Sequence, residues 1–409
     1  MANWDVTTAA ASKLFDTDVG LYSACVKIDA NHFLNFWRGV ASDGFVQTFE
    51  VNTTTWEVTT VSAQLEYDTQ LSQDISVVVI DTNHALAVWR GGTGITGKAQ
   101  VFTVNTTTWA TTTAAAAFTF DTQFNTYTAL VQIDTNHFLN VWRGGATTAD
   151  SWTQVLTVNT TTWAVTTAAA KLQFDTDLGS HFKCIQVDTN HFLNIWLGLN
   201  SDGYAQVFTV NTTTWAVTTA AAQFVFDTNG GSNNSIAKVD TNHFIHFWAG
   251  SAGDGYVEIL EVNTTTWAVT TTATWLEFDT QNGAHNSVVK VDTNHFINFF
   301  AGSATTANGF VQVFTVNTTT WAVTTAAVSL EFDTQDTDYN SAVKVDTNHF
   351  INFWRGGAVT SDGWAQVFAV EIPTPGSSNI KTYNTNSYAN IKSIDTNVIA
   401  NVKSLNTNV

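Results

Sequence analysis

Cysteine is scarce in this sequence, with only Cys25 and Cys184 among 409 residues. The two cysteines occupy equivalent places in two repeats that are not adjacent along the chain. A disulfide requires Cα atoms within roughly 7 Å of each other, which this repeat arrangement disfavours. We therefore interpret both cysteines as small buried hydrophobic residues.

Basic residues are also few, with 15 Lys and Arg against 34 Asp and Glu and a formal net charge of −19. A surface that binds nucleic acid needs clustered Lys and Arg to face the phosphates, so this composition argues against a nucleic-acid partner. It argues equally against a polybasic contact with a membrane surface. No apolar run approaches the roughly 20 residues of a membrane span, so we expect no direct membrane insertion.

The first residues, from Met1 to Asp5, carry neither the basic region nor the apolar core of a signal peptide. We therefore expect a protein that is made in the cytoplasm. It would either stay there or leave by a route other than general secretion.

What the sequence does contain is an internal repeat, the feature to be sought first because it decides the fold. The phrase DTNHF, with small variations, begins at Asp29, Asp81, Asp134, Asp188, Asp240, Asp292 and Asp346. These seven units follow one another at intervals of 52 to 54 residues.

Each unit has the chemistry of strands and hairpins. Val, Ile and Phe dominate segments such as SAVKVD, HFINFWRG and WAQVFAVE, while Asn, Asp and Gly mark the turns between them. The NTTT segments are interpreted as further turns, each followed by a fourth strand of the type WAVTT. Four short antiparallel strands repeated at about 50 residues predict an all-β fold, a seven-bladed β-propeller.

The N-terminus begins partway through a unit. Trp4 to Thr8 matches the fourth strand of the other units, where the equivalent strands begin at Trp56, Trp109, Trp163, Trp215, Trp267 and Trp321. The seventh unit has only three strands and ends near Val370. We therefore predict that the N-terminal strand closes the last blade, three strands plus one, in a propeller of residues 1–372. Such closure removes two open sheet edges.

A different composition follows the propeller. The only two prolines, Pro373 and Pro375, stand in a Pro/Gly/Ser linker of residues 373–378. Residues 379–409 then form an 11-residue repeat, NIKTYNTNSYA, NIKSIDTNVIA and NVKSLNTNV. Their alternating pattern predicts a short β-repeat tail, which the body, sister tails or a partner would hold in place. The residues predicted to dock it are Lys381, Lys392, Lys403, Tyr383, Ile394 and Leu405.

Repeated polar residues do not indicate an active site or a metal site. One His per unit, spread around a ring, does not converge on one ion, so we interpret these histidines as turn residues. The repeated aspartates lack a unique partner of the kind that acid–base catalysis needs. The spaced acidic loop of a calcium site is missing as well. We expect no catalytic residue, no metal and no cofactor.

Departures from the repeat are more informative. All four arginines follow the Trp of the second strand, in units that become neighbours when the ring closes, and the pairs are Trp37–Arg38, Trp89–Arg90, Trp142–Arg143 and Trp354–Arg355. Arginine beside Trp suits a carboxylate or a sugar ring, which makes these eight residues candidate ligand contacts. The other interpretation, which we favour, is that the arginines neutralise nearby acids.

A second departure lies two residues before the repeat aspartate. Lysine occupies this position in four units, at Lys27, Lys238, Lys290 and Lys344. First strands line the axis of a propeller, so these lysines are predicted to face a central channel that holds water or an anion. An equally good interpretation is that they extend to solvent.

Two segments resemble known proteins. The blade text VQVFTVNTTTWAVTT with VDTNHFINFW resembles repeats of uncharacterised seven-bladed propeller proteins of environmental and phage origin. The tail resembles the C-terminal NIKS-x-N repeats of virion-associated and phage-tail-like proteins, although many of those carry NG where this chain has NTN.

The resemblance implies a non-enzymatic structural protein of a phage virion or tail fibre, found in the virion or another extracellular assembly. The tail would dock it to other structural proteins, and the propeller would contact the host or cell-surface glycans. The alternative is a carbohydrate-binding adhesin or extracellular filament protein of a cellular organism. An enzyme is the least favoured class, because the units show no cluster of unusual polar residues that breaks the symmetry, and fold alone does not establish activity.

Overall fold

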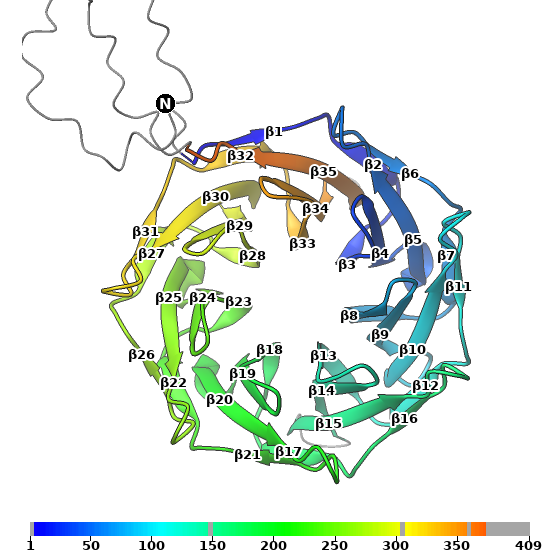
Figure 1. Cartoon of the computed structure of the whole chain (residues 1–409), viewed down its shortest axis with the longest axis horizontal. Helices are drawn as coiled ribbons and strands as arrows, with labels where there is room; N and C mark the ends of the chain where they lie inside the picture. Colours follow the sequence, from blue (N-terminus) through cyan, green and yellow to red (C-terminus); the bar gives the residue numbers. More distant parts are fainter. Residues whose placement is uncertain (1–3, 146–149, 303–306, 358–360, 374–409) are drawn as a thin grey trace, which may run out of the picture.

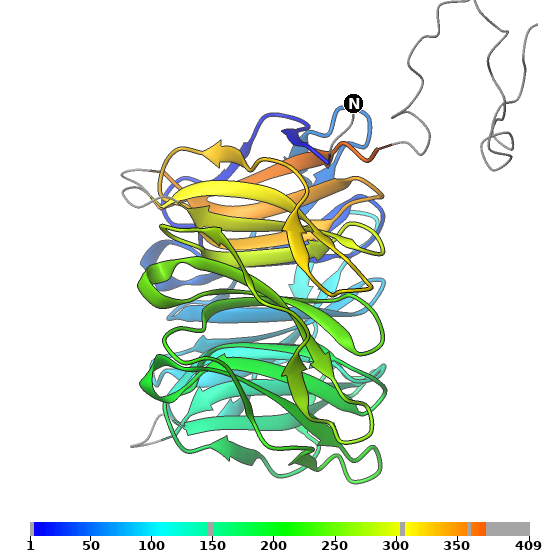
Figure 2. The same ribbon diagram turned by 90° about the vertical axis from the view of Figure 1, so that its left-hand side faces the viewer.

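The computed structural model describes residues 4–145, 150–302, 307–357 and 361–373. Seven antiparallel sheets surround a central axis, which confirms the all-β, seven-bladed propeller (Figure 1). Figure 2 shows the same ring from its edge. We number the blades by their repeat unit, so blade 1 starts at β3 and blade 7 combines β33, β34 and β35 with β1 and β2.

The first strand of each blade lies nearest the axis. These strands are β3 (Leu21–Lys27), β8 (Ser72–Asp81), β13 (Asn125–Gln132), β18 (Ser180–Gln186), β23 (Ser232–Lys238), β28 (Ala284–Lys290) and β33 (Asp338–Lys344). The second strands are β4 (His32–Arg38), β9 (His84–Gly91), β14 (His137–Gly144), β19 (His191–Leu197), β24 (His243–Ala249), β29 (His295–Gly302) and β34 (His349–Gly356). Second strands are buried on both faces because a neighbouring blade covers each side. This explains their nearly continuous apolar sequence.

The third strands are β5 (Gly44–Val51), β10 (Thr96–Val104), β15 (Asp150–Val158), β20 (Gly203–Val210), β25 (Gly255–Val262), β30 (Asn308–Val316) and β35 (Asp362–Val370). In blades 1, 4 and 5 a short 3₁₀ turn joins the second strand to the third, namely η1 (Val40–Ser42), η2 (Leu199–Ser201) and η3 (Ser251–Gly253).

Two short strands share the outer edge of each blade, and both pair with the third strand. The first of them is β1 (Val6–Thr8), β6 (Val58–Thr60), β11 (Thr111–Thr113), β16 (Val165–Thr167), β21 (Val217–Thr219), β26 (Val269–Thr271) or β31 (Val323–Thr325). The second is β2 (Lys13–Asp16), β7 (Leu65–Asp68), β12 (Phe118–Asp121), β17 (Leu172–Asp175), β22 (Phe224–Asp227), β27 (Leu276–Asp279) or β32 (Leu330–Asp333). The predicted fourth strand is therefore interrupted.

The repeated Trp lies before the outer strand, which corrects the predicted strand start. Asn52 Oδ1 accepts hydrogen bonds from the backbone amides of Thr54 and Thr55, and Trp56 closes the turn in a left-handed conformation with φ 62°. The strand starts two residues later, at Val58. The same holds at the N-terminus, where Trp4 has φ 63° and β1 starts at Val6.

The N-terminal residues close the ring as predicted. Val6 pairs with Val370 of β35, and Lys13 pairs with Ala365 of the same strand. In Figure 1, β1 lies alongside β35, at the opposite end of the colour scale. Blade 7 therefore joins the two ends of the described chain through backbone hydrogen bonds.

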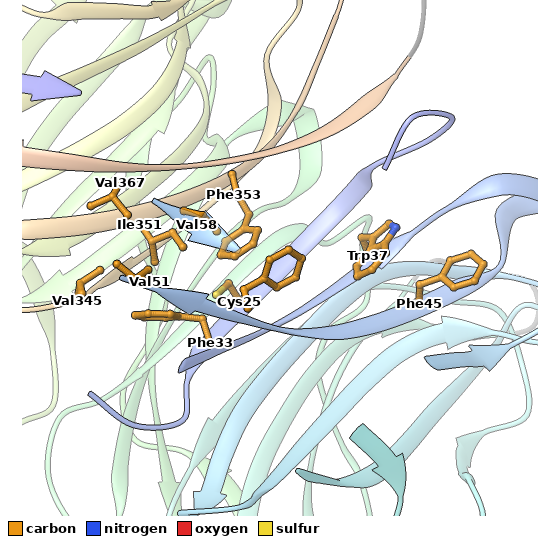
Figure 3. Close-up of a cluster of buried hydrophobic side chains, with 12 residues drawn as sticks. Cys25, Phe33, Trp37, Phe45, Val51, Val58, Val345, Ile351, Phe353 and Val367 are labelled. Atoms are coloured by element: carbon orange, nitrogen blue, oxygen red, sulfur yellow. The ribbon is translucent and has the colours of Figure 1, made fainter. Parts of the chain in front are cut away.

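The hydrophobic core lies between the blades. Figure 3 shows the cluster between blades 1 and 7, where Phe33 and Trp37 face Ile351 and Phe353, and all four side chains are essentially inaccessible. Each of the other six blade interfaces has a cluster of the same kind. Fully burying an aliphatic or aromatic side chain of this size contributes about 1.5–3 kcal/mol, so the interfaces dominate the stability of the ring.

The repeat histidines connect neighbouring blades. Each His Nδ1 lies 2.8–2.9 Å from the carboxylate of the Asp three residues earlier. Each ring also stacks on the turn Trp of the next blade, with centroids 3.4–3.6 Å apart, in the pairs His32–Trp109, His84–Trp163, His137–Trp215, His191–Trp267, His243–Trp321, His295–Trp4 and His349–Trp56. This supports the interpretation of the histidines as architectural.

Candidate functional site

The first strands carry a backbone irregularity near the axis. One residue per blade, the second or third of its strand, has positive φ, between 51° and 55°, where the pairing with the second strand shifts by a β-bulge. These bulge residues are Tyr22, Asp74, Tyr127, His181, Asn233, His285 and Tyr339. A left-handed conformation is unfavourable for residues other than glycine, and strain of this kind is concentrated at functional sites.

In several blades the side chain of the residue after the bulge donates a hydrogen bond to the bulge carbonyl of the preceding blade. Asn234 Nδ2 donates to the carbonyl of His181, Asn286 Nδ2 to that of Asn233, and Asn340 Nδ2 to that of His285. Thr128 Oγ1 donates to the carbonyl of Asp74. The bulges are therefore fixed by hydrogen bonds between blades, so their side chains project from a rigid frame.

All seven bulge residues line one cavity of about 440 Å³ at this end of the axis. Its wall is rich in aromatic rings. Tyr22 and Tyr339 have ring centroids 4.3 Å apart, and Tyr127 and His181 lie 4.9 Å apart. Asn233 and the Asn side chains beside it add amide donors and acceptors. The volume falls in the range of small-molecule binding sites, roughly 300–1,000 Å³.

Charged groups gather on one side of this cavity. Asp74 lies 3.9 Å from the guanidinium of Arg90, and burial raises the pKa of its carboxyl. Phe124 lies between two arginines, with the Arg90 and Arg143 guanidinium carbons 5.6 and 5.7 Å from its ring centroid. Lys183 is exposed to the cavity, yet the surrounding walls desolvate its ammonium and lower its pKa.

The two cavity histidines differ in their partners. Burial, together with the nearby charges of His285 and Lys183, lowers the pKa of His181 to about 4, so its ring is neutral near pH 7. His285 Nε2 lies 3.0 Å from Asp338, whose other carboxylate oxygen is bound by Arg355. Burial would raise the pKa of Asp338, but His285 and Arg355 outweigh it and lower that pKa. His285 is thus held in a fixed orientation.

The four arginines predicted as ligand contacts do not form one group. Arg90 and Arg143 line the cavity, whereas Arg38 donates to Ser42 Oγ and Arg355 pairs with Asp338 and Asp336. The structure therefore brings only two of them to the axial cavity. Arg355 shows the neutralising role that the sequence also suggested.

The neighbouring tryptophans are packing residues in the structure. Trp37, Trp89, Trp142 and Trp354 are at most 2% exposed. Their indole N–H groups donate to an aspartate of the preceding blade at 2.7–2.9 Å, in the pairs Trp37–Asp16, Trp89–Asp68, Trp142–Asp121 and Trp354–Asp333. These side chains lie between blades, where a surface ligand does not reach them.

The four lysines near the repeat aspartates lie at the other end of the first strands. Each ammonium donates to a backbone carbonyl of the preceding blade, in the pairs Lys27–Val345, Lys238–Val187, Lys290–Val239 and Lys344–Val291. Burial lowers the pKa of Lys344, and the neighbouring charges of Lys27 and Lys290 contribute. These three lysines are therefore close enough to interact, and each is tied to the wall of the ring.

The bulge residues were not identified from the sequence, although a signal was present. Between the FDT aspartate and the DTNHF phrase the units diverge, as in DTDVGLYSACVK from Asp16 and DTNGGSNNSIAK from Asp227. The second strands, such as HFLNVWRG and HFINFWRG, are by comparison nearly identical. Variation inside a first strand, where the other units keep the same backbone, marks a position at which the blades can differ in role.

Two further observations concern the described part of the chain. It contains no group of three or more His, Cys, Asp or Glu side chains placed to hold a metal ion. Within the same ranges, no helix has the length and apolar character needed to cross a membrane. The predicted docking residues Lys381, Lys392, Lys403, Tyr383, Ile394 and Leu405 lie outside the described residues.

Comparison with known proteins shows the fold and not a family. No protein-family model matches the chain, and no curated protein matches it significantly. A candidate 6-phosphogluconolactonase of Bacteroides fragilis is similar in structure, with TM-score 0.59 and 13% identity over 78% of this chain and 87% of that one. A second candidate 6-phosphogluconolactonase, from Bacteroides uniformis, has TM-score 0.58 and 10% identity over 76% and 85%. Sqt1 of Chaetomium thermophilum has TM-score 0.54 and 12% identity over 87% and 86%.

Proposed function

We propose that this protein is a carbohydrate-binding protein whose binding site is the axial cavity. One observation carries the proposal: the seven bulge residues, at which the repeats diverge, all line a single cavity of about 440 Å³. Aromatic rings stack on the apolar faces of sugars, while amides and imidazoles exchange hydrogen bonds with hydroxyl groups. A rigid ring that presents both kinds of group suits a polyhydroxylated ligand.

Binding rather than catalysis is the activity that we propose. Asp338, the carboxylate that orients His285, is also bound by Arg355, and Asp74 is close to Arg90. Both acids thus have basic partners, and no nucleophile stands beside His285 among the described hydrogen bonds. The similar solved structures include candidate enzymes, so the test must include a search for product.

The test is binding of the full-length protein to an array of glycans, followed by titration calorimetry with the best ligands. Tyr127→Ala and Asn233→Ala, both in the cavity, are expected to weaken binding at least about tenfold, the cost of removing one well-placed polar or stacking contact. Tyr256→Ala is the matched control, because Tyr256 is a half-exposed tyrosine outside the cavity.

Two outcomes would overturn this assignment. Binding that survives both cavity substitutions would place the site elsewhere. Conversion of a bound glycan to product would show that the protein is an enzyme, provided that His285→Gln abolishes the conversion.

We further propose that the propeller is displayed on a phage virion or tail fibre, where residues 379–409 dock to other structural proteins. The resemblance of that segment to virion-associated repeats supports this, as does its charge, with Lys381, Lys392 and Lys403 against Asp395 alone in a protein of net charge −19. An adhesin or filament protein of a cell would use the same cavity and differ only in location.

Immunogold labelling with an antibody to residues 1–372 separates the two locations. Gold on free virus-like particles is the expected result, and gold on cell envelopes or filaments would favour the adhesin. For docking, a chain that ends at Ile372 is expected to be missing from particles that contain the full-length chain. Equal incorporation of both would refute the role of the tail.

A further inference from the structure

The axial cavity differs in charge from the rest of the molecule. The whole chain has a formal net charge of −19. By contrast, the described residues that line the cavity include three basic side chains, Arg90, Arg143 and Lys183, and one acid, Asp74. A concave site of one sign concentrates ligands of the opposite sign. A basic cavity in an acidic protein therefore suits a ligand that carries negative charge.

The one acid does not account for all three cations. Asp74 is nearest Arg90, at 3.9 Å, and its carboxylate also accepts from the backbone amide of Tyr127. Among the described residues, neither Arg143 nor Lys183 forms an ion pair within 4.0 Å. Arg355 in blade 7 provides the contrast, since it has two acidic partners. The charge of Arg143 also acts on Asp74, so one acid faces three basic side chains, and in the described part of the chain neither Arg143 nor Lys183 has a direct ion pair.

Arg143 is held in position, and Lys183 lies in the same cavity wall. The Arg143 guanidinium lies over the ring of Phe124, which restricts its plane, and its strand pairing places it behind the bulge at Tyr127. Lys183 projects from β18 two residues after the bulge residue His181. An arginine held flat presents two parallel donors to an anionic group, and a lysine adds a point charge.

We propose that the ligand is an anionic sugar, with a carboxylate or a sulfate ester bound by Arg143 and Lys183. This rests on the proposed carbohydrate-binding function and names its ligand class. The sugar ring would lie against the tyrosines of the bulge ring, with hydroxyl groups toward Asn233 and the neutral ring of His181. Arg90 contributes less to binding the anionic group, because it already lies close to Asp74.

The experiment uses a glycan array arranged in matched sets. Each set contains a neutral glycan and versions that carry a uronic acid, a sialic acid or a sulfate ester. We expect the full-length protein to bind charged members at least about tenfold more tightly than the neutral member, the usual gain from charge-assisted hydrogen bonds. Added salt should weaken this binding. The preferred charged member identifies the anion.

Substitutions then test the two residues. The double variant Arg143→Gln, Lys183→Gln should lose the preference for charged members. Arg38→Gln should keep it, since Arg38 has the same repeat position in blade 1 but does not line the cavity. Thermal unfolding of both variants checks that they fold.

The outcomes are distinguishable. Equal binding of neutral and charged members, or a charge preference that persists in the double variant, would overturn the anionic ligand and leave carbohydrate binding in place. If the protein binds neither neutral nor charged glycans, both the anionic ligand and the proposed carbohydrate-binding function are overturned.

Discussion

At the scale of single residues, blade 6 differs from the others at one buried position. Phe300 stands where six blades have a Trp whose indole donates to an aspartate of the preceding blade. The matching aspartate, Asp279, keeps the same place, because its Oδ2 lies beside Gly302 as Asp121 Oδ2 lies beside Gly144. The acceptor is thus present in blade 6 without its donor.

Phe300→Trp should therefore stabilise the protein. The new indole would donate to Asp279, a hydrogen bond to a charged group that contributes about 1.5–3 kcal/mol, less any cost of fitting the larger ring. Chemical denaturation measures the change. Trp196→Phe, which removes the same bond in blade 4, is the reciprocal control and should destabilise. If Phe300→Trp lowers the stability, the space around Asp279 is not equivalent to that in the other blades.

Blade 5 departs from the repeat at two buried positions. Six blades have a Gln whose Nε2 donates to a carbonyl of the outer edge at 2.5–2.7 Å, whereas blade 5 has Glu258. Its Oε1 lies 3.6 Å from Nδ1 of His246, and both side chains are buried. Burial, with the charge of Asp227, raises the pKa of Glu258 to about 8, and burial lowers the pKa of His246 to about 3.

The stability of blade 5 should consequently depend on pH. Between the ordinary value of 4.5 and about 8, folded Glu258 keeps a proton that the unfolded chain releases, so stability is lost as the pH rises through this range. His246 has the opposite effect below its ordinary value of 6.5, which leaves about pH 6.5–8 as the informative window. Thermal unfolding should show a fall there that Glu258→Gln removes. A fall of the same size in Glu258→Gln would assign it to other groups.

At the scale of elements, the N-terminal strands complete the last blade. β1 and β2 supply the outer edge of blade 7, Trp4 stacks on His295 of blade 6, and Asp16 accepts from Trp37 of blade 1. These contacts add to those that β33 and β34 already make with both neighbouring blades.

Deletion of residues 1–16 should lower the thermal midpoint by several degrees and promote association, because it exposes the edge of β35 and part of a buried cluster. Light scattering after size-exclusion chromatography measures the association. Full-length protein with Val328→Ala is the control, since Val328 is 85% exposed on the outer edge. A deleted chain that stays monomeric with an unchanged midpoint would show that closure contributes little.

At the scale of the whole molecule, the Asp–His–Trp contacts occur at every blade interface. Burial alone would raise the pKa of these carboxyls, but the turn amides and the His ring outweigh it and lower the pKa of Asp29, Asp134, Asp188, Asp240, Asp292 and Asp346. Carboxyls with a lowered pKa stabilise the folded state above the ordinary value of 3.8, and this is lost as the pH falls through the folded values.

The thermal midpoint should therefore fall steeply below about pH 4, in one transition, because the same group is protonated at these six interfaces. Circular dichroism from about pH 6 to about pH 3 measures this. Several separate transitions, or no change below about pH 4, would show that the blades do not depend equally on these contacts.

The ring could be predicted from the sequence because period, turn chemistry and the incomplete seventh unit all agreed. The site could be predicted only in part: Arg90 and Arg143 line the cavity while Arg38 and Arg355 do not, because spacing alone does not show which side chains face a cavity. Bulges at Tyr127 and His181 turn those side chains toward the axis. A left-handed Tyr or His has no signature in composition or hydrophobic periodicity.

The bulge ring has a consequence for evolution and for engineering. At His181, Asn233 and His285 the bulge carbonyl accepts a hydrogen bond from an Asn side chain of the next blade, a contact that does not depend on which side chain the bulge carries. The natural ring already holds Tyr, Asp, His and Asn at one backbone conformation. New specificities are therefore accessible by exchanging these seven side chains alone, much as antibody loops vary on a constant framework.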